Sequence, residues 1–252
     1  MNIEKVAPLS GDSVALWHFP ISLDKDISSI FWHSLSEKEK QNANNFRFMQ
    51  DKLKYTFCRG VLRQILSLYT GISSSELVFS SNEFGKPYLA NTLPCPDLGF
   101  NLSHTSDYVV FTFGLNTELG IDLEKITPFP DVMQIAETFF STEEYLYLEQ
   151  LKSDEQVRFF FHFWTKKEAI LKAKGIGLAG EGLNALKNLK IDKENRIQFS
   201  DIHGDDSFWS LQILTFLPGY VGAIAYRGSK RRIEYQSYQN LGSGLQTGNV
   251  IV

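Results

Sequence analysis

The chain has 252 residues, of which 43% are hydrophobic and 13% aromatic, and its 25 basic and 29 acidic residues give a formal net charge of -4. This length and apolar content allow one large domain or two small ones with a core of their own. The slight acidic excess argues against a nucleic-acid-binding surface over the whole molecule, although it leaves room for a local basic pocket.

The cysteines and the apolar segments indicate the compartment. Cys58 and Cys95 lack the spacing of metal ligands, and the first residues lack the charged and apolar segments of a secretory leader. No apolar stretch approaches the roughly 20 residues that a membrane-spanning helix needs. We therefore expect a reduced, cytoplasmic protein with neither membrane nor nucleic acid as a partner.

The first half of the chain is predicted to mix helices and strands. Weak alternation predicts a strand over 14–19, and Ser36 followed by Glu39 has the capping-box spacing that opens a helix. Apolar residues at helical spacing predict a longer helix over 51–69, which Gly71 can end in the left-handed conformation. Strands are expected over 77–80, 100–103 and 108–114, separated by turns that contain Gly and Pro.

The second half is predicted to follow the same order. A strand over 118–123 precedes two helices that open with capping-box spacing at Ser141 and Ser153. The second of these helices is expected to run from about residue 154 to 174, where Gly175 ends it, so that it is roughly 30 Å long. Short strands are expected around Ile197, over 208–216 and over 220–226, and the polar tail 237–252 is predicted to be flexible.

Together the two halves predict an α+β fold. Each half reads as a strand, then helices, then antiparallel strands, and Tyr108-Val109 and Tyr220-Val221 open corresponding late strands. We therefore expect two similar subdomains, 1–117 and 118–236, in a pseudo-twofold arrangement, each an antiparallel sheet packed with helices.

Three acidic residues form the main candidate site. Asp122 and Glu124 are two residues apart on a predicted strand, so both carboxylates leave one face roughly 7 Å apart. Glu168 and Lys172 are four residues apart on the long helix and lie one above the other. Three converging carboxylates repel one another unless a cation relieves them, and an all-oxygen set suits Mg²⁺ with phosphate oxygens.

Each of these patterns also has a structural interpretation. Asp-x-Glu on a strand is commonly a solvated face, and a Glu-to-Lys pair on a helix is commonly a surface ion pair contributing about 0.3 to 0.5 kcal/mol. Glu144 follows Ser141 by three residues, so its expected role is to close the helix cap rather than to take part in chemistry.

Five ordered segments of the chain form a recognisable pattern. They are Phe84-Gly85-Lys86-Pro87-Tyr88, Phe100-Asn101-Leu102-Ser103-His104, Gly120-Ile121-Asp122-Leu123-Glu124, Phe139-Phe140-Ser141 with Glu144, and Trp164-Thr165-Lys166-Lys167-Glu168 with Lys172. In this order they resemble the signature of Sfp-type 4′-phosphopantetheinyl transferases, and the resemblance covers roughly residues 36–177.

The resemblance implies a reaction and a set of site residues. Such an enzyme moves the phosphopantetheine arm of coenzyme A to a serine of an acyl carrier protein or a peptidyl carrier domain and releases adenosine 3′,5′-bisphosphate. By this resemblance residues 1–117 bind coenzyme A, and residues 118–236 carry the metal and catalytic residues. The implied Mg²⁺ ligands are Asp122, Glu124 and Glu168, and the implied coenzyme-binding residues are Lys86, Ser103 and His104.

The chain departs from the family pattern before Phe46. Basic residues there commonly hold the 3′-phosphate of coenzyme A, whereas this chain has Asn42 and Asn45. Nearby candidates to replace them are Lys40, Arg47, Lys54 and Arg59, because ammonium and guanidinium groups both bind phosphate. The alternative is that Lys40 and Lys54 are solvated helix charges.

For catalysis we expect positioning and electrostatics to dominate. Lys86 and Lys172 would supply positive charge at the leaving phosphate, and Glu168 or a metal-bound water would accept the serine proton, which makes Glu168 and Lys172 the expected catalytic residues. An apolar and basic strip should receive the acidic carrier, and Phe46, Phe48 and Phe129 belong either to this strip or to the core.

Other functions remain open from the sequence. A noncatalytic carrier-binding or nucleotide-binding module of the same fold is one alternative, and a metal-dependent phosphohydrolase is another, although the His-Asp cluster of a metallophosphatase is missing from the sequence. The pathway, whether fatty acid, polyketide, nonribosomal peptide or lysine synthesis, is undetermined. We expect a monomer, because a duplicated chain supplies both halves of a site.

Overall fold

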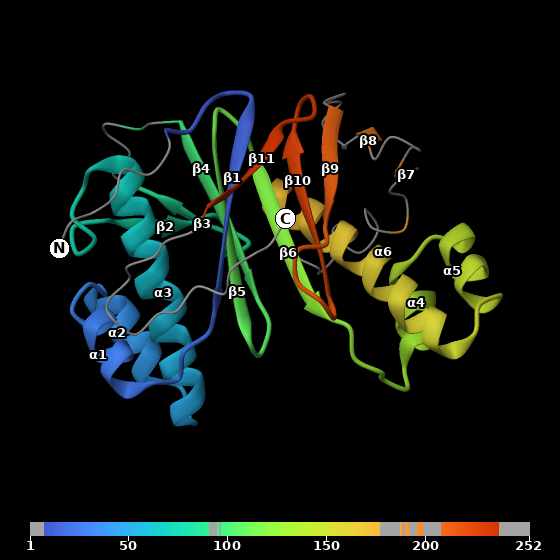
Figure 1. Ribbon diagram of the computed structural model, residues 1–252, viewed down its shortest axis with the longest axis horizontal. Helices are drawn as coiled ribbons and strands as arrows, with labels where there is room; N and C mark the ends of the chain where they lie inside the picture. Colours follow the sequence, from blue (N-terminus) through green and yellow to red (C-terminus); the bar gives the residue numbers. More distant parts are fainter. Residues whose placement is uncertain are drawn as a thin grey trace.

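The computed structural model describes residues 8–90, 95, 97–176, 187, 190–191, 196–198 and 208–236, and the tail predicted over 237–252 lies outside them. The chain forms two sheets that lie side by side with helices on their outer sides (Figure 1). The predicted α+β class is thus confirmed.

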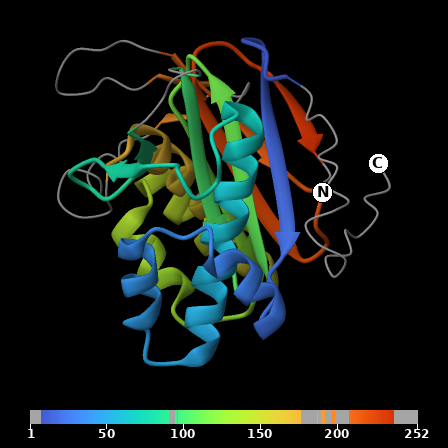
Figure 2. The same ribbon diagram turned by 90° about the vertical axis from the view of Figure 1, so that its left-hand side faces the viewer.

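The first half builds one sheet and the helices that cover it. Its elements are β1 (Ser13–Pro20), α1 (Lys25–Trp32), α2 (Glu37–Asn44), α3 (Met49–Thr70), β2 (Phe79–Ser81), β3 (Pro87–Leu89), β4 (Leu98–His104) and β5 (Tyr108–Leu115). The helix α3 crosses the outer face of this sheet (Figure 2), where Phe57 and Val61 pack against Trp17 and Phe111 in an apolar core. The short strands β2 and β3 form a separate hairpin.

The second half builds the other sheet on the same plan. Its elements are β6 (Leu119–Lys125), α4 (Val132–Phe139), α5 (Thr142–Glu149), α6 (Ser153–Lys174), β7 (Lys190–Ile191), β8 (Arg196–Gln198), β9 (Phe208–Leu214), β10 (Tyr220–Arg227) and β11 (Arg232–Gln236). The last strand, β11, leaves this half and pairs in parallel with β1 in the first sheet.

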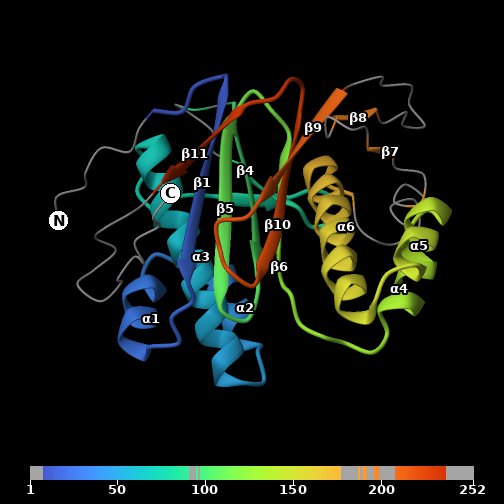
Figure 3. The same cartoon turned by 45° about the vertical axis from the view of Figure 1, so that its right-hand side comes forward.

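The strand orders show the internal symmetry. The first sheet contains the order β1-β5-β4 and the second contains β6-β10-β9, with antiparallel pairing throughout both triplets. Tyr108 and Tyr220, which begin the corresponding strands β5 and β10, meet across the symmetry axis with ring centroids 5.3 Å apart. The expected pseudo-twofold arrangement of two similar halves is confirmed (Figure 3).

An apolar layer joins the two sheets. Val14, Leu16 and Val110 of the first sheet pack against Leu119, Ile121 and Leu123 of β6 and their neighbours on β10. On β6 the intervening residues face α6, so alternation along one strand places apolar side chains between the sheets and polar ones toward the helix. The order across the molecule is therefore helix, sheet, sheet, helix.

Local signals in the sequence agree with most of these elements. Two of the three predicted capping boxes, Ser36 with Glu39 and Ser141 with Glu144, are present, and Gly71 and Gly175 end α3 and α6 with φ of 71° and 70°. The predicted cap at Ser153 was wrong, because Lys152 is the N-cap of α6 and pairs with Glu155, while the helix itself begins at Ser153, one residue from the expected start.

Five elements were not predicted from the sequence, namely α1, α4, β3, β7 and β11. Among the described residues, no helix combines the length and the apolar character needed to cross a membrane.

Candidate active site

A glycine on β6 lets the long helix approach the sheet. A Cβ added at Gly120 would lie 2.2 Å from both the carbonyl oxygen of Ala169 and the nitrogen of Ala173, which are backbone atoms of α6. Only glycine therefore allows this helix-to-strand contact. The contact places Glu168 and Lys172 of α6 over the same face of β6 that carries Asp122 and Glu124.

Three side chains from three elements meet at this contact. The Lys172 ammonium lies 2.7 Å from Asp122 Oδ1 and 3.1 Å from Ser103 Oγ, and the Ser103 hydroxyl donates to Asp122 Oδ1 at 3.0 Å. Asp122 and Ser103 are buried, with 3% and 7% of their surface exposed. The cluster thus joins β4 of the first half to β6 and α6 of the second.

The carboxylates near Lys172 carry more negative charge than it neutralises. Burial, followed by the charges of Asp122 and Glu168, raises the pKa of Glu124 to about 7, with Lys172 opposing. Burial and Asp122 likewise raise the pKa of Glu168, again with Lys172 opposing. Asp122 Oδ2 and Glu168 Oε1 are buried without a hydrogen-bond partner. Such a site favours an additional cation.

The predicted metal ligands are near one another but are not arranged as a formed site. In the part of the chain that the structure describes, no three His, Cys, Asp or Glu side chains are grouped closely enough to hold a metal ion. The donors nevertheless have the character that Mg²⁺ requires, since they are hard carboxylate oxygens, two of them buried and unpaired.

The seam between the halves is held by a buried amide. Asn101 Oδ1 of β4 accepts a hydrogen bond of 2.9 Å from the Ile121 backbone nitrogen of β6. This bond fixes the edge of one sheet against the edge of the other and so sets where Ser103 meets Asp122. Asn101 lies in one of the five ordered segments singled out in the sequence, but this hydrogen bond was not predicted.

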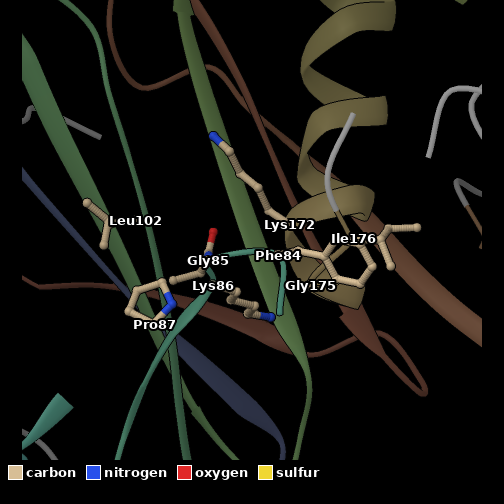
Figure 4. A pocket seen from close by; sticks show the side chains of 9 residues that line it. Phe84, Gly85, Lys86, Pro87, Leu102, Lys172, Gly175 and Ile176 are labelled. Atoms are coloured by element: carbon tan, nitrogen blue, oxygen red, sulfur yellow. The ribbon is translucent and has the colours of Figure 1, made fainter. Parts of the chain in front are cut away.

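An open pocket of about 240 Å³ adjoins this cluster. Its lining residues come from the turn before β3, from β4 and from the end of α6, and they are Phe84, Gly85, Lys86, Pro87, Asn101, Leu102, Lys172, Gly175 and Ile176 (Figure 4). The pocket therefore lies between the two halves. It combines apolar walls with the ammonium of Lys172, which suits a ligand that has both apolar and anionic parts.

Comparison with known proteins identifies the family. A family model described as the 4′-phosphopantetheinyl transferase superfamily matches residues 118–225, and one described as the N-terminal region of 4′-phosphopantetheinyl transferase matches residues 24–113. The transferase HetI of Nostoc sp. is 35% identical over 171 residues, which cover 68% of this chain and 72% of HetI. The chain belongs to the 4′-phosphopantetheinyl transferase superfamily.

Other transferases match over a longer span. The 4′-phosphopantetheinyl transferase Sfp of Bacillus subtilis is 28% identical over 221 residues, which cover 87% of this chain and 95% of Sfp. A putative 4′-phosphopantetheinyl transferase of Synechocystis sp. is 31% identical over 179 residues, 70% of each chain. The resemblance inferred from the five segments is thereby confirmed. The protein is an enzyme that transfers phosphopantetheine from coenzyme A to carrier proteins.

The structure places the basic residues of this transferase in different environments. Lys40 pairs with Glu37 at 2.8 Å, Arg59 pairs with the buried Glu39 at 2.6 Å, and Arg47 lies over the ring of Phe48. Lys54, by contrast, makes no hydrogen bond or ion pair within the described residues. Local desolvation and then the charges of Lys54 and Lys172 lower the pKa of His104, which shows that both ammonium groups are near that imidazole.

Lys86 occupies a position that the sequence did not predict. Its ammonium donates to two backbone carbonyls of the second half, those of Ala173 at 2.7 Å and Leu119 at 3.0 Å. In Figure 4 the Lys86 and Lys172 side chains extend in opposite directions, with their nitrogens on opposite sides of the pocket. Lys86 therefore lines the transferase pocket, but its ammonium is directed to the protein backbone.

Glu144 has the structural role expected for it, together with one that was missed. Its carboxylate accepts from the Ser141 nitrogen at 2.8 Å, which closes the cap of α5. It also pairs at 2.9 Å with Lys167, whose side chain is fully buried next to Glu168 on α6.

The three aromatic residues considered for a carrier-binding strip separate into two groups. Phe46 and Phe48 are exposed, whereas Phe129 packs against Phe160 and Phe161.

Proposed function

We propose that a serine hydroxyl of an apo acyl carrier protein or peptidyl carrier domain attacks the β-phosphorus of coenzyme A at this site, releasing adenosine 3′,5′-bisphosphate. The observation that carries the proposal is the buried cluster of Asp122, Ser103 and Lys172, with Glu124 and Glu168 beside it, at the edge of a pocket between the halves. In this assignment residues 1–117 bind coenzyme A, and residues 118–236 supply the acids and Lys172.

Asp122, Glu124 and Glu168 are the proposed Mg²⁺ ligands. The support for this assignment is their burial and mutual repulsion, which raise the pKa of Glu124 and Glu168, together with the unpaired buried oxygens on Asp122 and Glu168. When bound, Mg²⁺ would neutralise the diphosphate of coenzyme A and polarise it toward attack.

Lys172 and Glu168 are the proposed catalytic residues. The Lys172 ammonium is already held by Asp122 and Ser103, so it is positioned to stabilise negative charge on the leaving phosphate without reorganisation. Glu168 has a raised pKa and an unpaired Oε1, which suits it to accept the proton of the carrier serine. Because the reactants are held in place, a covalent enzyme intermediate is unnecessary.

Lys54, Ser103 and His104 are the proposed coenzyme contacts. Lys54 is the preferred partner for the 3′-phosphate, because Lys40, Arg47 and Arg59 are engaged by Glu37, Phe48 and Glu39. Replacing Lys54 with Ala should raise the Michaelis constant for coenzyme A, whereas Lys40→Ala should leave it unchanged. An unchanged constant in the Lys54 variant would remove this assignment.

The carrier is proposed to dock where basic and apolar side chains adjoin the pocket, with the exposed Phe46 and Phe48 as candidate contacts. One chain contains both halves of the site, so we propose that a monomer is active, in the cytoplasm. Size-exclusion chromatography with light scattering measures the molar mass in solution, and a dimer that persists on dilution would contradict the proposed monomer.

Intact-mass spectrometry of an apo carrier protein incubated with the enzyme, coenzyme A and Mg²⁺ tests the reaction. We expect the carrier to gain about 340 Da, the mass of phosphopantetheine, and to gain nothing with Asp122→Ala or without metal. Coenzyme A binding without a mass gain on fatty-acid, polyketide or peptidyl carriers would instead indicate a noncatalytic binding module. Release of adenosine bisphosphate without any carrier would indicate a phosphohydrolase.

A further inference from the structure

The turn before β3 is closed on itself by one asparagine. Asn82 Oδ1 accepts hydrogen bonds from the backbone nitrogens of Phe84 at 3.1 Å and Lys86 at 2.9 Å. The backbone nitrogen of Asn82 donates to the Lys86 carbonyl at 3.0 Å. Gly85 within the turn has a φ of 85°. With its own polar groups satisfied, this five-residue turn is a preorganised unit.

The same turn docks on the C-terminal end of α6. Lys86 Nζ donates to Ala173 O at 2.7 Å, and Asn82 Nδ2 donates to Gly175 O at 2.7 Å. The last carbonyls of a helix lack partners within the helix, so donors from elsewhere must satisfy them. Here both donors come from the first half, while α6 belongs to the second. Lys86 also donates to Leu119 O at the start of β6.

The fit between the turn and the helix end is close. A Cβ at Gly175 would lie 2.7 Å from Asn82 Nδ2 and 3.1 Å from the Lys86 side chain, so the turn contacts the helix cap directly. Burial lowers the pKa of Lys86 to about 8, with Glu118 opposing, which agrees with an ammonium withdrawn from solvent. Two of its three donor hydrogens point at protein carbonyls.

We propose that Asn82 and Lys86 are positioning residues that clamp the end of α6 from the opposite half of the molecule and thereby hold Glu168 and Lys172 in register with Asp122. This inference rests on the proposed function for the roles of Glu168 and Lys172. Ala173 directly follows Lys172, so a shift of the helix end moves the Lys172 side chain away from Asp122 Oδ1 and Ser103 Oγ.

The proposal differs from a direct contact between Lys86 and a phosphate of coenzyme A. A direct contact would make Lys86 matter mainly for the affinity of coenzyme A, and uncharged Asn82 would have little effect. A clamp makes both residues matter mainly for turnover at saturating coenzyme A, because misplacement of catalytic groups by about 1 Å costs up to roughly 100-fold. A clamp also predicts that the effects of substituting Lys86 and Asn82 on turnover are not additive.

The test compares Lys86→Met, Lys86→Arg, Asn82→Ala and their Met/Ala double variant with wild type. Glu83→Gln, an exposed position in the same turn, is the matched control. Turnover and the Michaelis constant for coenzyme A are measured with an apo carrier protein. Hydrogen exchange is measured at the Gly175 and Ile176 amides, which donate to the Lys172 and Leu171 carbonyls at the end of α6.

For a clamp we expect Lys86→Met and Asn82→Ala each to lower turnover by at least about tenfold with less than a threefold change in the Michaelis constant. Exchange at the two amides should be about tenfold faster in both variants. Lys86→Arg should recover part of the turnover, and Glu83→Gln should match wild type.

Unchanged exchange at the helix end would overturn the proposal, as would a Lys86→Met effect confined to the Michaelis constant. A wild-type enzyme without transferase activity would refute the proposed function instead, and the exchange measurement would still test the clamp. Thermal denaturation checks that each variant folds. If a Lys86 variant does not fold, hydrogen exchange in Asn82→Ala, which keeps the charge of Lys86, decides the proposal.

Discussion

Gly120 gives the sharpest test of how the fold builds the active site. A Cβ at this position would approach Ala169 O and Ala173 N to 2.2 Å, and Ala173 Cα to 2.8 Å. All three are backbone atoms, so a side-chain rotation cannot relieve the contact. Ordinary van der Waals separation would require α6 to retreat by about 1 Å. The substitution Gly120→Ala therefore moves Glu168 and Lys172 away from Asp122.

Two magnitudes follow from that displacement. Overpacking of a tight contact costs about 1 to 3 kcal/mol of unfolding free energy, which corresponds to a fall in Tm of roughly 2 to 12 °C for a chain of this size. A catalytic misplacement of about 1 Å lowers turnover by roughly 100-fold. The loss of activity should therefore greatly exceed the fraction of enzyme that is unfolded at the assay temperature.

The assay is turnover with an apo carrier protein at 25 °C, alongside calorimetry. Gly11→Ala is the control, because an added Cβ at Gly11 meets nothing within 4 Å. We expect the control to keep wild-type turnover and Tm. Wild-type turnover in Gly120→Ala, or a loss fully explained by unfolding, would refute the idea that this helix-to-strand contact sets the site geometry.

Three further predictions concern charge. Lys172→Met should lower turnover at saturating coenzyme A by at least about 100-fold, because it removes a preorganised ammonium. A turnover within threefold of wild type would contradict the proposed role of Lys172. Because the pKa of Glu124 is about 7 when folded and ordinarily 4.5, the metal-free protein should lose stability as pH rises from about 4.5 to 7. Mg²⁺ should therefore raise Tm more at pH 8 than at pH 5, and equal shifts would argue against a carboxylate site. Glu39→Gln should cost about 3 kcal/mol in urea unfolding, since it leaves the buried Arg63 guanidinium and the half-buried Arg59 guanidinium without their carboxylate. Glu37→Gln, which affects an exposed carboxylate, should change little, and similar losses in both variants would contradict the difference.

Local patterns in the sequence were sufficient to predict the elements that carry the acids. Alternation along 119–125 places Asp122 and Glu124 on one face and Leu119, Ile121 and Leu123 on the other, as the structure confirms. Helical spacing places Glu168 and Lys172 on one side of α6. Each of these features depends on residues within one turn or one strand, where periodicity is informative.

Short elements and long-range contacts were not predictable in this way. The helix α1 has eight residues, with Ser28 and Ser29 at its centre, and its cap at Asp24 is the main local signal. The strand β3 has three residues and begins at Pro87, too short for alternation to show. The direction of the Lys86 ammonium depends on Leu119 and Ala173, which are distant in sequence.

The pairing of β11 with β1 has a consequence for how the protein folds during synthesis. Ser13 is paired with Arg232, so closing the first sheet brings together residues separated by most of the chain. Such a closure carries an entropic cost and slows folding, and until it occurs the free edge of β1 can pair with other chains. On the ribosome, the first sheet therefore stays incomplete until residues 232–236 have been synthesised and can pair with β1.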